Sequence, residues 1–118
     1  MKKLLDDIIK FRDERGWRQH DTPQALAKSI IIEAAELLEN YQWEDTNPNL
    51  TNVEEELADV LIYSLAMCSD LGMDPEEIIR RKLVKNEVKY PKTNQWLKMS
   101  IIIFSLNKPL FGIFRDFY

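Results

Sequence analysis

The chain is poor in cysteine, glycine and proline, which are common in disulfide-rich, turn-rich or unstructured proteins. Its 118 residues include one cysteine, three glycines and five prolines. A lone cysteine, Cys68, supports neither a disulfide framework nor a cysteine-based metal site, and it fits a small buried hydrophobe. The low glycine and proline content disfavours disorder and turn-rich all-β folds. A globular helical domain of ordinary size is the class that remains.

Long apolar runs are also missing, and none is sufficient to cross a bilayer. The first residue is followed by two lysines and then by Asp6 and Asp7, which is unlike a secretory leader. We therefore expect a cytoplasmic protein with no membrane partner.

Basic residues are absent from the middle of the chain. No lysine or arginine lies between Lys28 and Arg80, where thirteen Asp and Glu occur, whereas nine basic residues follow from Arg80 onward. Acidic segments repel phosphate unless cations screen them, and basic segments attract it. The asymmetry suits carboxylates that hold a metal while a phosphorylated substrate reaches basic side chains, although two solvated helix faces are the plainer alternative. It argues against nucleic acid as a partner, because backbone phosphate requires a basic face.

The spacing of apolar residues and the helix-capping signals predict four helices. Thr22-Pro23 and Asp74-Pro75 each place a cap residue before a proline at the first helical position, and Thr51 with Glu54 forms a capping box. Gly16 and Gly72 are natural stops. The expected ranges are about 2–15, 22–41, 51–72 and 74–90.

Residues 92–118 depart from this pattern and are expected to form a separate apolar tail. The β-branched run 101–104 fits a strand without excluding a helix. Because a free tail of this kind would be prone to aggregation, we expect it to cover a subunit interface or the outside of the helical bundle.

Two pairs of acidic residues share the inward faces of successive helices. Glu33 and Glu36 are three residues apart in the second predicted helix, as are Glu56 and Asp59 in the third, so each pair can direct two carboxylates to one point. Unpaired charge is costly to bury, and four facing carboxylates raise each other's pKa. A divalent cation removes both costs, and oxygen ligands favour Mg²⁺, Mn²⁺ or Ca²⁺. A single such pair is common on solvated helices.

Several strings in the sequence together resemble a known family. They are Ile31-Ile32-Glu33-Ala34-Ala35-Glu36-Leu37, Tyr41-Gln42-Trp43, Glu55-Glu56-Leu57-Ala58-Asp59-Val60, and the set Lys82, Asn86, Lys89, Tyr90 and Pro91. This combination resembles the MazG-like nucleotide pyrophosphohydrolases of the all-α NTP pyrophosphatase superfamily. The resemblance covers about residues 3–91, and the upstream Trp17 and Pro23 also match. One departure is that Asp21 stands where many relatives have a histidine.

The resemblance implies a four-helix MazG-like bundle in residues 1–91, assembled as a dimer or dimer of dimers, with residues 92–118 outside the family pattern. It implies hydrolysis of a nucleoside triphosphate to the monophosphate and pyrophosphate, as in clearance of unwanted nucleotides. The residues it implicates fall into three groups. They are Glu33, Glu36, Glu56 and Asp59 for Mg²⁺ (or Mn²⁺), Lys82, Asn86 and Lys89 for phosphate, and Trp17, Trp43 and Tyr63 for the base.

In the mechanism we expect, water attacks the α-phosphorus and is oriented by one inward carboxylate, Glu36 in preference to Glu33. Core packing is an equally good role for Tyr63. The alternatives to an enzyme are a helical nucleotide-binding or regulatory module without turnover, and a nucleic-acid-binding helical protein. Homodimers or homotetramers are the expected assemblies.

Overall fold

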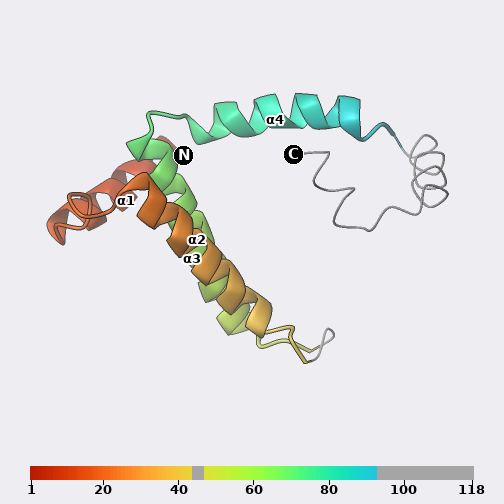
Figure 1. Cartoon of the computed structure of the whole chain (residues 1–118), viewed down its shortest axis with the longest axis horizontal. Helices are drawn as coiled ribbons and strands as arrows, with labels where there is room; N and C mark the ends of the chain where they lie inside the picture. Colours follow the sequence, from red (N-terminus) through yellow and green to blue (C-terminus); the bar gives the residue numbers. More distant parts are fainter. Residues whose placement is uncertain (44–46, 93–118) are drawn as a thin grey trace. The chain divides into compact units, whose positions relative to one another are not determined.

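Four α-helices make up the part of the chain that the computed structural model describes, which is residues 1–43 and 47–92, and no strand occurs there. The predicted all-α class is confirmed. The chain divides into two units, Met1–Glu76 and Glu77–Tyr118, and each is described by itself. Figure 1 labels the helices α1 (Lys2–Glu14), α2 (Pro23–Glu39), α3 (Leu50–Asp70) and α4 (Pro75–Lys89). None of these four combines the length and apolar character that a membrane span requires.

The start of α2 follows the predicted chemistry. The Thr22 hydroxyl accepts a hydrogen bond from the backbone N–H of Ala25 at 3.1 Å, and Pro23 is the first helical residue. The side chain thereby satisfies one of the N–H groups that a helix start leaves without an intrahelical partner. At α4, Pro75 again opens the helix, as its sequence position predicts.

The predicted cap of α3, Thr51, was wrong by two residues. The cap is Asn49, whose side-chain oxygen accepts hydrogen bonds from the N–H groups of Thr51 at 3.1 Å and Asn52 at 3.3 Å. Leu50 is therefore the first helical residue, and Thr51 lies inside the first turn rather than before it. Asparagine is at least as good a cap as threonine, and its position two residues earlier decides the boundary.

Two glycines stop helices where the sequence predicts. Gly16 follows α1 and Gly72 follows α3, with φ angles of +66° and +67°. This left-handed region is costly for residues with a Cβ atom and easily reached by glycine. Each of these glycines lies two residues after the last helical residue and lets the chain change direction there.

Helices α2 and α3 form a long hairpin, and they lie side by side in Figure 1. Helix α1 packs against α3. Within Met1–Glu76 the hydrophobic core takes one buried side chain from each of α1, α2 and α3: Ile8, Leu26 and Ala66. Three partly buried residues of α3 pack against them, namely Tyr63, Leu65 and Met67. This small core fixes α1 over one part of the hairpin.

The second unit contains most of α4. The predicted tail, residues 92–118, lies outside the described residues apart from Lys92, so its expected strand or helix and its covering role stay predictions. The same holds for the predicted boundary at residue 91.

Candidate active site

Three of the four predicted metal ligands meet between α2 and α3. Glu33, Glu56 and Asp59 each offer a carboxylate oxygen, and these three oxygens all lie within 4.8 Å of one another. All three side chains are partly buried. The i, i+3 spacing places Glu56 and Asp59 on one face of α3, and the packing of α2 along α3 brings Glu33 opposite them.

Glu36, the fourth predicted ligand, lies at the exposed edge of this group. Its carboxyl group lies close enough to those of Glu33 and Glu56 to help raise the pKa of each. The hairpin therefore brings all four acidic side chains together, and we call Glu33, Glu36, Glu56 and Asp59 the acidic cluster.

The acidic cluster has an unfavourable electrostatic environment of its own. Burial raises the pKa of Glu33 to about 7, with further contributions from Glu36 and from neighbouring negative charges. Burial and the same neighbours also raise the pKa of Glu56. Within Met1–Glu76 no lysine or arginine forms an ion pair with a member of the cluster. A bound cation would relieve this mutual repulsion.

The chemistry of the donors fits a hard divalent cation. The cluster offers only carboxylate oxygens, which suit Mg²⁺, Mn²⁺ or Ca²⁺, and it contains no imidazole or thiolate. Carboxylates from two helices facing one another also follow the pattern of metal sites built inside helical bundles. The residues present therefore fit the metal that the family resemblance implies.

A pocket adjoins the acidic cluster and shares Asp59 with it. Its volume is about 430 Å³, within the range of small-molecule sites, and its walls come from α1, the connection from α1 to α2, and α3. Two of the three predicted base-binding residues, Trp17 and Tyr63, line it. The complete lining is aromatic (Phe11, Trp17, Tyr63), acidic (Asp7, Asp21, Asp59), basic (Arg12) and aliphatic (Ile8, Ile62, Ala66).

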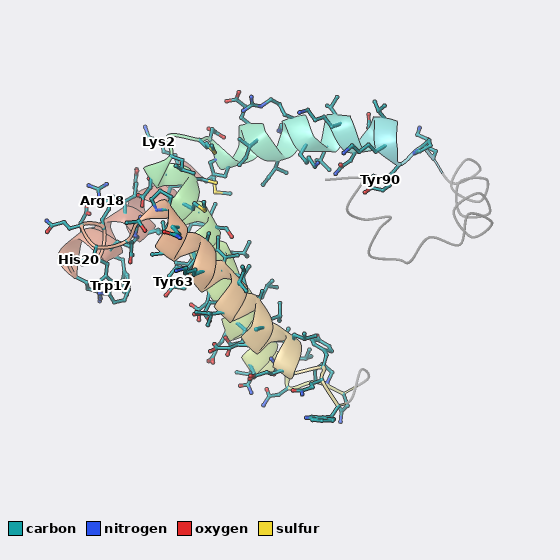
Figure 2. All side chains as sticks on the ribbon, viewed as in Figure 1. Lys2, Trp17, Arg18, His20, Tyr63 and Tyr90 are labelled. Atoms are coloured by element: carbon teal, nitrogen blue, oxygen red, sulfur yellow. The ribbon has the colours of Figure 1, made fainter. Side chains whose placement is uncertain are left out.

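Packing fixes the aromatic side of the pocket. Phe11 and Trp17 meet edge to face, with ring centroids 5.7 Å apart and an interplanar angle of 75°. The Arg15 guanidinium lies 3.4 Å from the centroid of the Phe11 ring. Edge-to-face rings and a cation over a ring are both favourable arrangements. Figure 2 shows Trp17 in the connection that follows α1 and Tyr63 on the hairpin.

Tyr63 lies where either of the roles considered for it is possible, and its role in base binding stays a prediction. Its side chain packs against the core and also lines the pocket. Burial raises the pKa of its hydroxyl, as do the charges of Glu33, Asp59 and Asp21, so the hydroxyl stays protonated at neutral pH. It can donate a hydrogen bond at the boundary between the pocket and the acidic cluster.

Sequence reasoning missed Arg12, the one charged side chain that is buried in the described residues. It is 4% exposed and donates two hydrogen bonds to the Asp70 carboxylate, at 3.0 and 2.8 Å. The hydrogen bonding to Asp70 raises the pKa of Arg12 despite burial. The available signal was its position on the apolar stripe of α1, four residues after Ile8. The same reasoning that singled out the inward carboxylates applies to an inward arginine.

The remaining predicted site residues lie away from this pocket's lining or in the second unit. Trp43 is 90% exposed and is not part of the lining. Lys82, Asn86 and Lys89 lie on α4 at spacings that place them along one helix face. Roles in base and phosphate binding stay predictions for these four residues.

An all-α hairpin with carboxylates converging beside an aromatic pocket corresponds to a known class of protein. Residues 28–98 match the MazG-like family, which is more than half of the chain. The chain therefore belongs to the MazG-like family, as the resemblance indicated.

Individual relatives are consistent with this assignment. The dCTP pyrophosphatase 1 of Mus musculus is 33% identical over 100 residues, covering 74% of this chain and 59% of that protein. The protein of the same name from Bos taurus is 31% identical with the same coverage. This chain thus spans about 59% of the length of these curated relatives.

A solved structure gives the same fold. A pyrophosphatase from Archaeoglobus fulgidus is 48% identical and superposes with a TM-score of 0.73. The match covers 78% of this chain and 93% of that one.

Proposed function

We propose that this protein is a Mg²⁺-dependent nucleoside triphosphate pyrophosphohydrolase that converts a (d)NTP and water to the (d)NMP and pyrophosphate. The observation that carries the proposal is the convergence of three carboxylate oxygens within 4.8 Å, next to an aromatic pocket that shares Asp59. Membership of the MazG-like family and the names of its pyrophosphatase relatives support it.

The acidic cluster is the proposed holder of Mg²⁺, with Mn²⁺ as a substitute. When bound, the cation supplies charge neutralisation and Lewis-acid activation for the triphosphate. Glu33, Glu56 and Asp59 are the ligands that the geometry favours, and Glu36 completes the set from the exposed edge.

The protein's own residues have three tasks in this reaction. Glu36, ahead of Glu33, orients the water that attacks the α-phosphorus, because its exposed carboxyl group reaches both Glu33 and Glu56. Trp17 and Tyr63 hold the base in the pocket, and Trp43 is a further candidate. Basic and amide side chains of α4 hold the departing pyrophosphate, namely Lys82, Asn86 and Lys89.

Assembly as a homodimer or homotetramer is part of the proposal. Large apolar side chains are exposed along the hairpin, including Ile31 and Leu38 on α2 and Leu61 on α3. Exposed apolar surface of this kind is typical of faces covered by another subunit. The proposed role is clearance of unwanted nucleotides in the cytoplasm.

The decisive variant is Glu56→Gln, which keeps the shape of a proposed ligand and removes its charge. We expect pyrophosphate release from a nucleotide panel to fall by about 100-fold or more, because loss of one charged ligand weakens a hard-cation site. Glu54→Gln, an exposed residue of the same helix turn, is the matched control and should keep wild-type turnover.

Both variants should retain wild-type circular dichroism, so that a loss reports on chemistry. Wild-type turnover by Glu56→Gln, or turnover independent of Mg²⁺, would contradict the ligand assignment. Nucleotide binding without any pyrophosphate release by the wild type would favour the alternative, a non-catalytic binding module.

A further inference from the structure

The turn after α1 places a carboxylate beside the aromatic wall of the pocket. The backbone N–H groups of His20 and Asp21 both donate to the carbonyl of Trp17, each at 2.9 Å, which closes one helical turn. Residues four apart in such a turn lie on the same side. Trp17 and Asp21 accordingly both line the pocket, whereas His20 does not.

The Asp21 carboxylate retains its capacity to accept hydrogen bonds. It forms an ion pair with Arg12, but the distance between Arg12 Nη2 and Asp21 Oδ2 is 3.8 Å, and no hydrogen bond joins them. Arg12 directs its two hydrogen bonds to Asp70 instead. Within the described residues the Asp21 carboxylate accepts no hydrogen bond, and its side chain is 32% exposed.

The surroundings of Asp21 keep its position defined. Arg12 is 4% exposed, and its Nε has no hydrogen-bond partner in the described part of the chain. The guanidinium is held by Asp70 and attracts Asp21, which lines the same pocket. A carboxylate beside an aromatic ring is therefore available to a planar ligand that stacks on that ring.

An ionised carboxylate only accepts hydrogen bonds, and this property discriminates between nucleobases. Cytosine and adenine present an exocyclic amino group, which donates, where uracil and hypoxanthine present a carbonyl oxygen, which accepts. A carbonyl oxygen facing Asp21 would set two acceptors against each other.

We propose that Asp21 is a specificity-determining residue that selects nucleotides whose base has an exocyclic amino group over their oxo counterparts. The inference rests on the proposed function, because it places the base of the substrate in the pocket lined by Trp17 and Asp21. The aromatic wall holds the face of the base, and Asp21 accepts from the amino group at its edge.

Two matched substrate pairs test the proposal: dCTP with dUTP, and dATP with dITP. Members of each pair differ at the amino or oxo position and in the protonation of the adjacent ring nitrogen, and they share sugar and triphosphate. We expect wild-type kcat/KM to favour the amino member by at least about tenfold, since one such hydrogen bond discriminates by this order. Asp21→Asn, whose side chain both donates and accepts, should reduce the preference to near unity or reverse it.

Ratios within a pair cancel any general effect of removing a negative charge. Asp6→Asn, on the exposed surface of α1 and outside the pocket, makes the same charge change and should keep the wild-type ratio. If Asp21→Asn does not fold, Asp21→Ser removes the carboxylate without a bulky substitute and should also abolish the preference. Unchanged ratios in a folded Asp21 variant would overturn the proposal.

A binding measurement separates this inference from the proposed function. Calorimetric titration with dCMP and dUMP requires no turnover, and the wild type should bind dCMP about tenfold more tightly. If no triphosphate is hydrolysed but dCMP is preferred and Asp21→Asn abolishes the preference, the inference stands and the hydrolase proposal fails. Equal binding of dCMP and dUMP by the wild type overturns the inference even if turnover is present.

Discussion

The acidic cluster and the Arg12–Asp70 pair differ in how their buried charge is compensated. In the cluster, four carboxyl groups face one another and the pKa of Glu33 rises to about 7. At the pocket wall, Arg12 is almost fully buried, yet two short hydrogen bonds to Asp70 balance its charge. The charge of Arg12 is thus compensated by Asp70 within the chain, whereas no basic side chain of Met1–Glu76 pairs with the acidic cluster.

The largest expected change in the free energy of unfolding comes from breaking the Arg12–Asp70 pair. Arg12→Met should lower the free energy of unfolding by about 3 kcal/mol, because removal of one partner leaves the other charge without compensation. The matched control is Arg18→Met, which breaks a 2.8 Å ion pair with Asp13 whose side chains are 47% and 43% exposed. That change should cost less than about 1 kcal/mol. Urea denaturation measures both, and equal losses would refute the distinction.

In the acidic cluster without metal, removal of a charge should stabilise the protein rather than destabilise it. Glu33→Gln should raise the free energy of unfolding at pH 8 by on the order of 1 kcal/mol, allowing for solvent screening, because it removes an unfavourable charge. Glu54→Gln, outside the cluster, serves as the control and should change it by less. Urea denaturation in EDTA provides the measurement, and destabilisation by Glu33→Gln would show that its charge is already compensated.

The pH dependence of stability sharpens the same contrast. The folded-state pKa of Glu33, about 7, exceeds the ordinary value of 4.5, so the folded protein binds more protons between these values. The stabilisation that comes from this tighter proton binding is fully present below pH 4.5 and is lost as the pH rises through about 7. We expect thermal unfolding in EDTA to show decreasing stability over this window. Glu33→Gln should flatten the decrease, and a wild-type curve as flat as the variant's would contradict the assignment.

The two regions also differ in how far the sequence could predict them. The cluster follows from helix periodicity, because the i, i+3 spacing of Glu33 with Glu36 and of Glu56 with Asp59 depends only on each helix forming. Adjacent helices then bring the pairs together. The helix boundaries were predictable to within about two residues for the same local reasons. The error at the start of α3 arose because Asn49 and Thr51, two residues apart, are both good caps.

The pocket depends on tertiary packing that local patterns do not encode. Arg12 and Asp70 are 58 residues apart, and their pairing is decided by how α1 docks on α3. Asp21 was identified only as a departure from the family pattern, and its place in the pocket depends on the turn that begins at Trp17. The family resemblance also implicated Trp43 in base binding, but its side chain is not part of the lining of this pocket.

The attachment of α1 through Arg12 links occupancy of the pocket to the integrity of the N-terminal helix. Ile8, Phe11 and Arg12 belong both to α1 and to the pocket lining, so a ligand bound there loses contacts whenever α1 detaches. By mass action, such a ligand suppresses local opening of α1. A nucleotide should thus slow amide exchange and proteolytic cleavage in the first fifteen residues, far along the chain from the acidic side chains.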